Sequence, residues 1–120
     1  MYSVYHFDTY SNMALFYFVF QPLARLGAEV TGIDASAELI EVAKWHAALD
    51  SNVTNRVTYS SSTIEDLCNS NTANGRAQLY DGVVASEIVE HVSDAKLFVN
   101  ACCSVVKVIF LIYLSTAKCW

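Results

Sequence analysis

The feature that most constrains this fold is the alternation of short strand-like runs with longer stretches of helical periodicity. Residues 29–33 form a β-branched run that follows Gly27 and ends at Asp34. Ser36 can then cap a helix, with Glu38 in the first turn, where a negative charge suits the helix dipole. The apolar stripe of this helix, which should end near residue 50, is Leu39, Ile40, Ala43 and Ala47. The pattern predicts a strand followed by an amphipathic helix.

A second unit of the same kind follows. Residues 56–60 are a predicted strand, and Ser62 with Glu65 matches a capping box for a short helix through Leu67. The polar stretch 69–76 is predicted to be a turn. The chain therefore repeats the order strand, helix, turn.

A third unit completes the pattern. Residues 80–85 are strand-like, and Ser93 or Asp94 can cap the next helix. The stripe of that helix is Leu97, Phe98, Ala101, Cys102 and Val105. The apolar runs 108–114 and 14–20 are further strand candidates. Strands alternating with helices at this spacing predict an α/β fold with a parallel sheet and flanking helices.

Composition narrows the class of protein. The chain has 120 residues, which suits one domain, and its net charge of −5 argues against nucleic acid as a partner. The apolar runs are far shorter than the ~20 residues that span a bilayer. Residues 1–24 contain no Lys or Arg, so no mitochondrial transit peptide is visible. The cysteines form no Cys-x-x-Cys pair and are expected to be reduced thiols: Cys68, Cys102, Cys103 and Cys119.

Asp34 is the first candidate site residue. Ligands of open α/β sheets bind outside the carboxyl ends of the strands, where an acid can accept hydrogen bonds from both hydroxyls of a ribose. Capping of the next helix is the alternative explanation for this residue. A glycine-rich turn is expected roughly 20 residues earlier, but no glycine occurs before Gly27.

The second candidate site is a cluster of two carboxylates and an imidazole at the end of the third strand. Glu87, Glu90 and His91 lie within five residues and follow Ser86. Oxygen ligands suit a hard divalent cation, and the added imidazole leaves magnesium, manganese and zinc open. A solvated acidic turn with a surface histidine is the alternative interpretation.

The sequence from about residue 21 to 107 resembles the ubiquinone-biosynthesis O-methyltransferases, a family of class I S-adenosylmethionine (SAM)-dependent methyltransferases. Three passages carry the resemblance: Pro-Leu-Ala-Arg-Leu-Gly-Ala-Glu-Val-Thr-Gly-Ile-Asp at 22–34, Ala-Lys-Trp-His at 43–46 and Val-Val-Ala-Ser-Glu-Ile-Val-Glu-His-Val at 83–92. The chain then divides into a divergent segment 1–20, a partial methyltransferase domain 21–107 and a divergent segment 108–120.

The resemblance implies a partial Rossmann-like sheet that binds SAM. It implies that Asp34 binds the ribose, that Ser86 contacts the cofactor, and that Glu87, Glu90 and His91 ligate Mg²⁺. The implied reaction methylates a hydroxyl of a polyprenylated dihydroxybenzene in the pathway to coenzyme Q. The metal would hold that hydroxyl and favour its ionised form. The catalytic base stays unassigned between His91 and Glu87.

The resemblance also implies a setting: the matrix face of the mitochondrial inner membrane, with at most peripheral membrane association, and other coenzyme Q biosynthesis proteins as partners. Two departures bear on activity. The family's Asp-x-Gly-x-Gly-x-Gly loop has no counterpart in residues 1–20, and the family's Pro-Gly-Gly does not follow residues 105–107. Three hypotheses follow: a methyltransferase, an inactive form with little turnover of its own that binds a partner, and a different nucleotide-binding enzyme.

Overall fold

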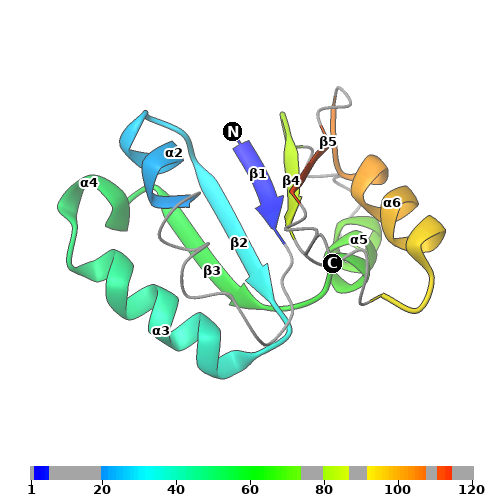
Figure 1. The fold of residues 1–120 in the computed structure, drawn as a ribbon, viewed down its shortest axis with the longest axis horizontal. Helices are drawn as coiled ribbons and strands as arrows, with labels where there is room; N and C mark the ends of the chain where they lie inside the picture. The colour runs from blue at the N-terminus through cyan, green and yellow to red at the C-terminus, as the bar shows by residue number, and fades with distance from the viewer. Residues whose placement is uncertain (1, 6–19, 74–79, 87–91, 108–110, 115–120) are drawn as a thin grey trace, which may run out of the picture.

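The computed structural model describes residues 2–5, 20–73, 80–86, 92–107 and 111–114 (Figure 1). Within these residues, five strands form one parallel sheet: β1 (Tyr2–Tyr5), β2 (Val30–Asp34), β3 (Val57–Ser61), β4 (Val83–Ser86) and β5 (Leu111–Leu114). The helices are α2 (Gln21–Arg25), α3 (Ala37–Ala48), α4 (Ser51–Thr54), α5 (Ile64–Ala73) and α6 (Ala95–Ser104). The predicted α/β class with a parallel sheet is confirmed.

The strand order is β3-β2-β1-β4-β5, so β1 lies in the middle of the sheet between β2 and β4. The chain winds outward from β1 to β2 and β3 on one side, and then crosses over to β4 and β5 on the other. The predicted strand 14–20 lies outside the described residues, except Phe20, which is the N-cap of α2. The predicted run 108–114 contributes β5 from residue 111 onward, and residues 108–110 are not described.

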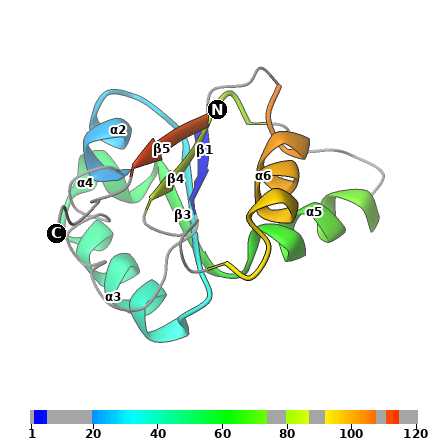
Figure 2. The same cartoon turned by 45° about the vertical axis from the view of Figure 1, so that its right-hand side comes forward.

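Helices cover both faces of the sheet, with α2, α3 and α4 on one side and α5 and α6 on the other (Figures 1 and 2). Two buried clusters result. The α3 core consists of Phe20, Ala24, Ala28, Val30, Ile40, Ala43, Ala47, Val53, Tyr59 and Val84. The α6 core consists of Ile33, Ile64, Tyr80, Val83, Ala85, Phe98, Cys102 and Val105. Successive side chains of a strand point to opposite faces, which is why Val83 and Val84 belong to different cores.

The first predicted helix is confirmed as α3. The Ser36 hydroxyl accepts a hydrogen bond from the Leu39 N–H at 3.4 Å, so Ser36 is the N-cap. The stripe packs on the sheet as expected, with Ile40, Ala43 and Ala47 buried and Leu39 partly buried. The helix ends at Ala48, with Leu49 as its C-cap. Local periodicity therefore defined this element and the face that it buries.

Helix α5 differs from its prediction at both ends. Thr63 and Asp66 form the capping box, with reciprocal bonds between backbone N–H and side-chain oxygen at 3.2 and 3.1 Å, so the predicted Ser62–Glu65 pair is wrong by one residue. The helix continues to Ala73, where a turn was predicted from residue 69. Leu67 and Cys68 pack against the α6 core, and this contact supports a helix whose next residues are polar and exposed.

Helix α6 begins after Asp94, whose carboxylate accepts a hydrogen bond from the Leu97 N–H at 3.0 Å. Phe98, Cys102 and Val105 are buried as predicted, but Leu97 is 64% exposed. Adjacent residues of a helix are rotated by about 100°, so a stripe centred on Phe98 and Cys102 turns Leu97 toward solvent. The inclusion of Leu97 in the core stripe was wrong.

The ring of Tyr59 in β3 packs against a glycine in β2. Gly32 is paired with Tyr59, and the Tyr59 ring lies over the glycine. A Cβ at position 32 would lie 2.5 Å from a ring carbon, closer than such atoms come. Gly32 therefore makes room for the tyrosine in the α3 core.

Candidate functional site

The carboxyl ends of the parallel strands form the edge at which such sheets bind ligands. β2 ends there at Asp34 and β4 ends there at Ser86, with β1 between the two strands. Since neighbouring strands are about 4.8 Å apart, the backbones of β2 and β4 are separated by roughly 10 Å. The strand order reverses at β1 and β4, which is where a ligand crevice is expected. The fold thus brings two of the predicted site residues to one edge.

Asp34 is 1% exposed. Its Oδ1 accepts a hydrogen bond from the Ser36 N–H at 2.6 Å, and its backbone carbonyl accepts one from the Ser62 N–H at 2.9 Å. The carboxylate therefore organises the turn from β2 into α3, while Ser36 itself caps the helix. This role is close to the alternative explanation for Asp34, in which it caps the next helix. A carboxylate, however, has several acceptor positions and can also bond a ligand hydroxyl. Ribose binding by Asp34 stays a prediction.

Glu87, Glu90 and His91 lie outside the described residues, so their predicted metal site is not tested by the structure. Ser86 is described as the last residue of β4, where its backbone is paired in register with Leu114. The described part of the chain contains no group of three or more His, Cys, Asp or Glu side chains that could hold a metal ion. Metal binding by the 87–91 cluster stays a prediction.

Among the described cysteines, the thiol with the most strongly shifted pKa belongs to the α6 core. Burial raises the pKa of the Cys102 thiol to about 12, and burial also raises the pKa of Tyr80. Both groups are members of the α6 core and are protonated at neutral pH. They act as packing groups and are unsuited to nucleophilic attack.

A cavity at the opposite edge of the sheet was not predicted from the sequence. Its volume is about 530 Å³, and it is lined by Ala24, Arg25, Leu26, Gly27, Glu29, Ser51, Asn52, Asn55 and Arg56. These residues lie at the end of α2, before β2, and around α4 up to the start of β3. The available signal was the position of Arg25 shortly before one predicted strand and of Arg56 at the start of the next, but only tertiary contacts bring them to one cavity.

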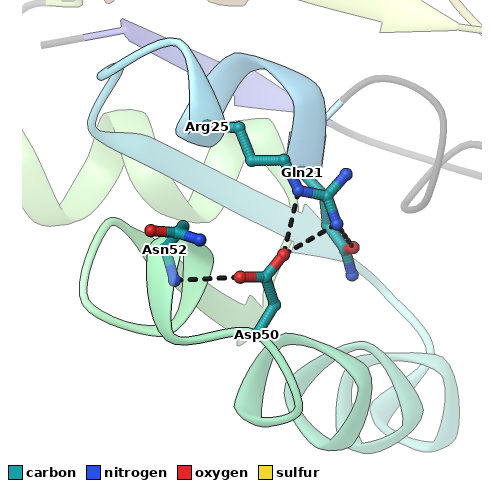
Figure 3. Close-up of polar contacts among 4 residues, drawn as sticks. All are labelled: Gln21, Arg25, Asp50 and Asn52. Carbon is teal, nitrogen blue, oxygen red and sulfur yellow. Dashed lines mark hydrogen bonds and ion pairs between the residues drawn. The ribbon is translucent and has the colours of Figure 1, made fainter.

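An ion pair between helices α2 and α4 borders this cavity (Figure 3). Arg25 contacts the Asp50 carboxylate through Nε at 2.9 Å and Nη2 at 2.8 Å, and its Nη2 also donates to Gln21 at 3.4 Å. Asp50 in turn accepts a hydrogen bond from the Asn52 N–H at 2.9 Å, as the N-cap of α4. The hydrogen bond from Arg25 and, to a lesser extent, the one from Asn52 hold the pKa of the Asp50 carboxyl below its usual range.

The strand order defines a partial Rossmann-like α/β domain, a class of fold that binds ligands at the carboxyl ends of its strands. Residues 17–109 match the family model of the methyltransferase domain, and the chain belongs to that family. Within the described residues, no helix is long and apolar enough to cross a membrane.

Curated relatives carry a more specific name. The chain is 41% identical over 87 residues to the mitochondrial ubiquinone biosynthesis O-methyltransferase of Rattus norvegicus. The matched region covers 72% of this chain and 24% of that protein. It is 46% identical over 87 residues to the ubiquinone biosynthesis O-methyltransferase of Mesorhizobium japonicum, covering 72% of this chain and 31% of the relative. For the Brucella ovis protein of that name, identity is 43% over 96 residues, with coverage of 80% and 35%. The chain spans about a quarter to a third of the length of these relatives.

Proposed function

We propose that this chain represents part of a SAM-dependent O-methyltransferase of ubiquinone biosynthesis that methylates a hydroxyl of a polyprenylated dihydroxybenzene. Membership of the methyltransferase family and identity of 38–46% to proteins with that name support the proposal. The observation that carries it is the buried Asp34 carboxylate at the carboxyl end of β2, beside the reversal of strand order. That is the position at which Rossmann-like sheets bind the ribose of a nucleotide.

Two residues at the strand ends fit SAM, whereas the sequence between β1 and α2 departs from the family pattern. On the β2 side, Asp34 offers a carboxylate on a well-packed strand, and Ser86 ends the strand on the far side of β1. Between β1 and α2, residues 6–19 contain no glycine, so side chains occupy a sequence position where the resemblance implies bare backbone. We therefore expect weak SAM binding and little turnover by this chain alone. The alternative, an inactive form that binds other coenzyme Q proteins, rests on this departure and on the missing Pro-Gly-Gly after residues 105–107.

We also propose that Glu87, Glu90 and His91 are ligands of Mg²⁺. They follow β4 directly, and β4 ends at the same edge of the sheet as Asp34. A bound Mg²⁺ would supply a positive charge that orients a substrate hydroxyl and favours its ionised form. Whether His91 or Glu87 accepts the proton stays open, because a metal ligand is a poor free base.

The proposed location is the mitochondrion, at the matrix face of the inner membrane. The relatives of Rattus norvegicus, Mus musculus and Homo sapiens are named as mitochondrial proteins. A polyprenylated phenol partitions into lipid, so the enzyme must meet its substrate at a membrane surface. Peripheral association with the membrane and with other coenzyme Q biosynthesis proteins would meet that need.

The test is calorimetric titration of the purified chain with SAM, with and without Mg²⁺. The Asp34→Asn variant keeps an oxygen for the Ser36 N–H but loses the charge, and we expect its SAM affinity to fall about tenfold or more. Glu41→Gln is the matched control, because Glu41 is an exposed acid of α3 that pairs with Lys44 at 2.8 Å. Equal affinity of wild type and Asp34→Asn, or no SAM binding by a sample with cooperative urea unfolding, would contradict the proposal.

A further inference from the structure

The cavity at the amino ends of β2 and β3 is separate from the proposed cofactor edge. Glu29, in its lining, immediately precedes β2, whereas Asp34 ends the same strand. At about 3.3 Å per residue, the two ends of β2 are roughly 15 Å apart, with the packed sheet between them. Its volume of about 530 Å³ falls within the ~300–1,000 Å³ of small-molecule sites. The cavity can therefore hold a ligand that does not compete with one at Asp34.

The lining is rich in hydrogen-bond donors that have capacity to spare. Arg56 uses Nη1 for the Gly27 carbonyl at 3.0 Å and the Glu29 carboxylate at 3.2 Å. Among the described residues, Nε and Nη2 of Arg56 and Nη1 of Arg25 make no hydrogen bond. The side-chain amides of Asn52 and Asn55 make none within the described part of the chain either. A ligand rich in acceptor oxygens would satisfy this set of donors.

Ion pairs fix the geometry of both guanidinium groups. Arg25 is held by Asp50 and Gln21, as Figure 3 shows, and Arg56 is held by Gly27 and Glu29. A side chain that is already ordered loses less conformational entropy when it binds a ligand. The same pairs neutralise the carboxylates of Glu29 and Asp50, which would otherwise repel an anion. Arg25, Arg56 and Glu29 line the cavity and Asp50 borders it, so these four charged groups sum to zero in a chain whose net charge is −5.

We propose that this cavity binds a small molecule that carries carboxylate or phosphate groups. The planar guanidinium of Arg56, with two free donor nitrogens, forms bidentate bonds to either group. Arg25 supplies a second positive charge, and the amides of Asn52 and Asn55 bond the remaining oxygens. The site is distinct from the SAM edge, and its occupation does not depend on the proposed methyltransferase activity.

The test is titration of the folded chain with pyrophosphate and, separately, with citrate, at a constant ionic strength of ~0.15 M set with sodium chloride. We expect saturable binding of one probe. Calorimetry, or the amide chemical shifts of residues 51–56, measures this binding. Arg56→Gln should weaken the affinity for the probe at least tenfold. The affinity of Arg56→Lys should lie between those of the wild type and Arg56→Gln, because lysine keeps the charge but cannot form the bidentate bonds of a guanidinium group. Preference for pyrophosphate or for citrate identifies the ligand group.

Two controls make the result decisive. Lys44→Gln removes one positive charge from an ion pair on α3 outside the cavity, and it should leave binding unchanged. Asp34→Asn should also leave it unchanged, so that a failure of the SAM proposal is separable from a failure of this one. Circular dichroism and urea unfolding establish that each variant is folded. Absence of saturable binding to either probe, or equal weakening by Lys44→Gln and Arg56→Gln, would overturn the proposal.

Discussion

The two faces of the sheet are filled in different ways. Under α2 and α3, the α3 core contains four alanines (Ala24, Ala28, Ala43 and Ala47) beside the rings of Phe20 and Tyr59. Under α5 and α6, the α6 core contains a single alanine, and the space is filled by larger side chains such as Tyr80, Phe98 and Ile64. The helices of the α3 side are also joined by the Arg25–Asp50 ion pair. The comparison teaches that the α3 core combines small side chains with two rings, whereas the α6 core consists almost entirely of larger side chains.

Truncation of a buried ring should have the largest effect, and Phe98 of the α6 core is such a ring. Phe98 is 2% exposed, and Phe98→Ala leaves a cavity that the surrounding helices fill only in part. We expect a loss of about 3–5 kcal/mol in the free energy of unfolding. Ala43→Gly in the α3 core should cost only about 1 kcal/mol. Urea unfolding of both variants measures the difference, and equal losses would contradict the expectation that a buried ring contributes more to stability than a buried alanine.

Added volume should be costly on the α3 side. Gly32→Ala places a methyl group 2.5 Å from the buried Tyr59 ring, and we expect about 1–3 kcal/mol of destabilisation in urea unfolding. The double variant Gly32→Ala with Tyr59→Leu removes the ring and should lose less than the sum of the two single changes. Strict additivity would show that contact between the added methyl group and the Tyr59 ring is not the cause of the destabilisation.

Loss of a helix cap should have an intermediate effect on each face. Asp94→Ala removes the 3.0 Å bond to the Leu97 N–H at the start of α6, for an expected loss of about 1 kcal/mol. Ser36→Ala removes a longer bond of 3.4 Å at the start of α3 and should cost less. The midpoints of urea unfolding rank the two variants. A larger loss for Ser36→Ala would reverse the expected order.

The smallest effect is expected from pH, through the ion pair of the α3 side. Hydrogen bonds from the Arg25 guanidinium and the Asn52 N–H lower the folded-state pKa of Asp50 below its ordinary value of 3.8. The stabilisation is therefore complete above the unfolded-state pKa and is lost as pH falls through the folded-state pKa. Between pH 6 and pH 3, urea midpoints of the wild type should fall more steeply than those of Asp50→Asn. Parallel curves would mean that the exposed pair contributes nothing measurable.

Much of the fold and part of the candidate site could be predicted from local sequence. The order of β2, α3, β3, α5, β4 and α6 follows from periodicity, and the caps at Ser36 and Asp94 follow from residue type. The placement of Asp34 at the end of a strand was predicted for the same reason and is confirmed. The ligand roles of Asp34 and of the 87–91 cluster stay predictions, since they depend on what binds at that edge.

Errors arose where distant contacts outweighed the local signal. The residues that continue α5 to Ala73 are polar and resemble a turn, but packing of Leu67 and Cys68 on the α6 core supports the helix. Leu97 is apolar and close to the stripe, yet the orientation of α6 on the sheet exposes it. Propensity is a weak prior in such cases, because tertiary packing contributes more free energy than the local preference does.

By itself, the sequence determined the alternation of strands and helices, the faces that most helices bury, and the acid at the end of β2. These features depend on residues within one or two turns of each other, where side-chain period and capping act. Only the tertiary structure decided that residues 2–5 lie at the centre of the sheet and that Arg25 meets Asp50, 25 residues away in the sequence, beside a polar cavity. Such contacts form when the helices pack on the sheet, and no local pattern encodes which distant groups will then be neighbours.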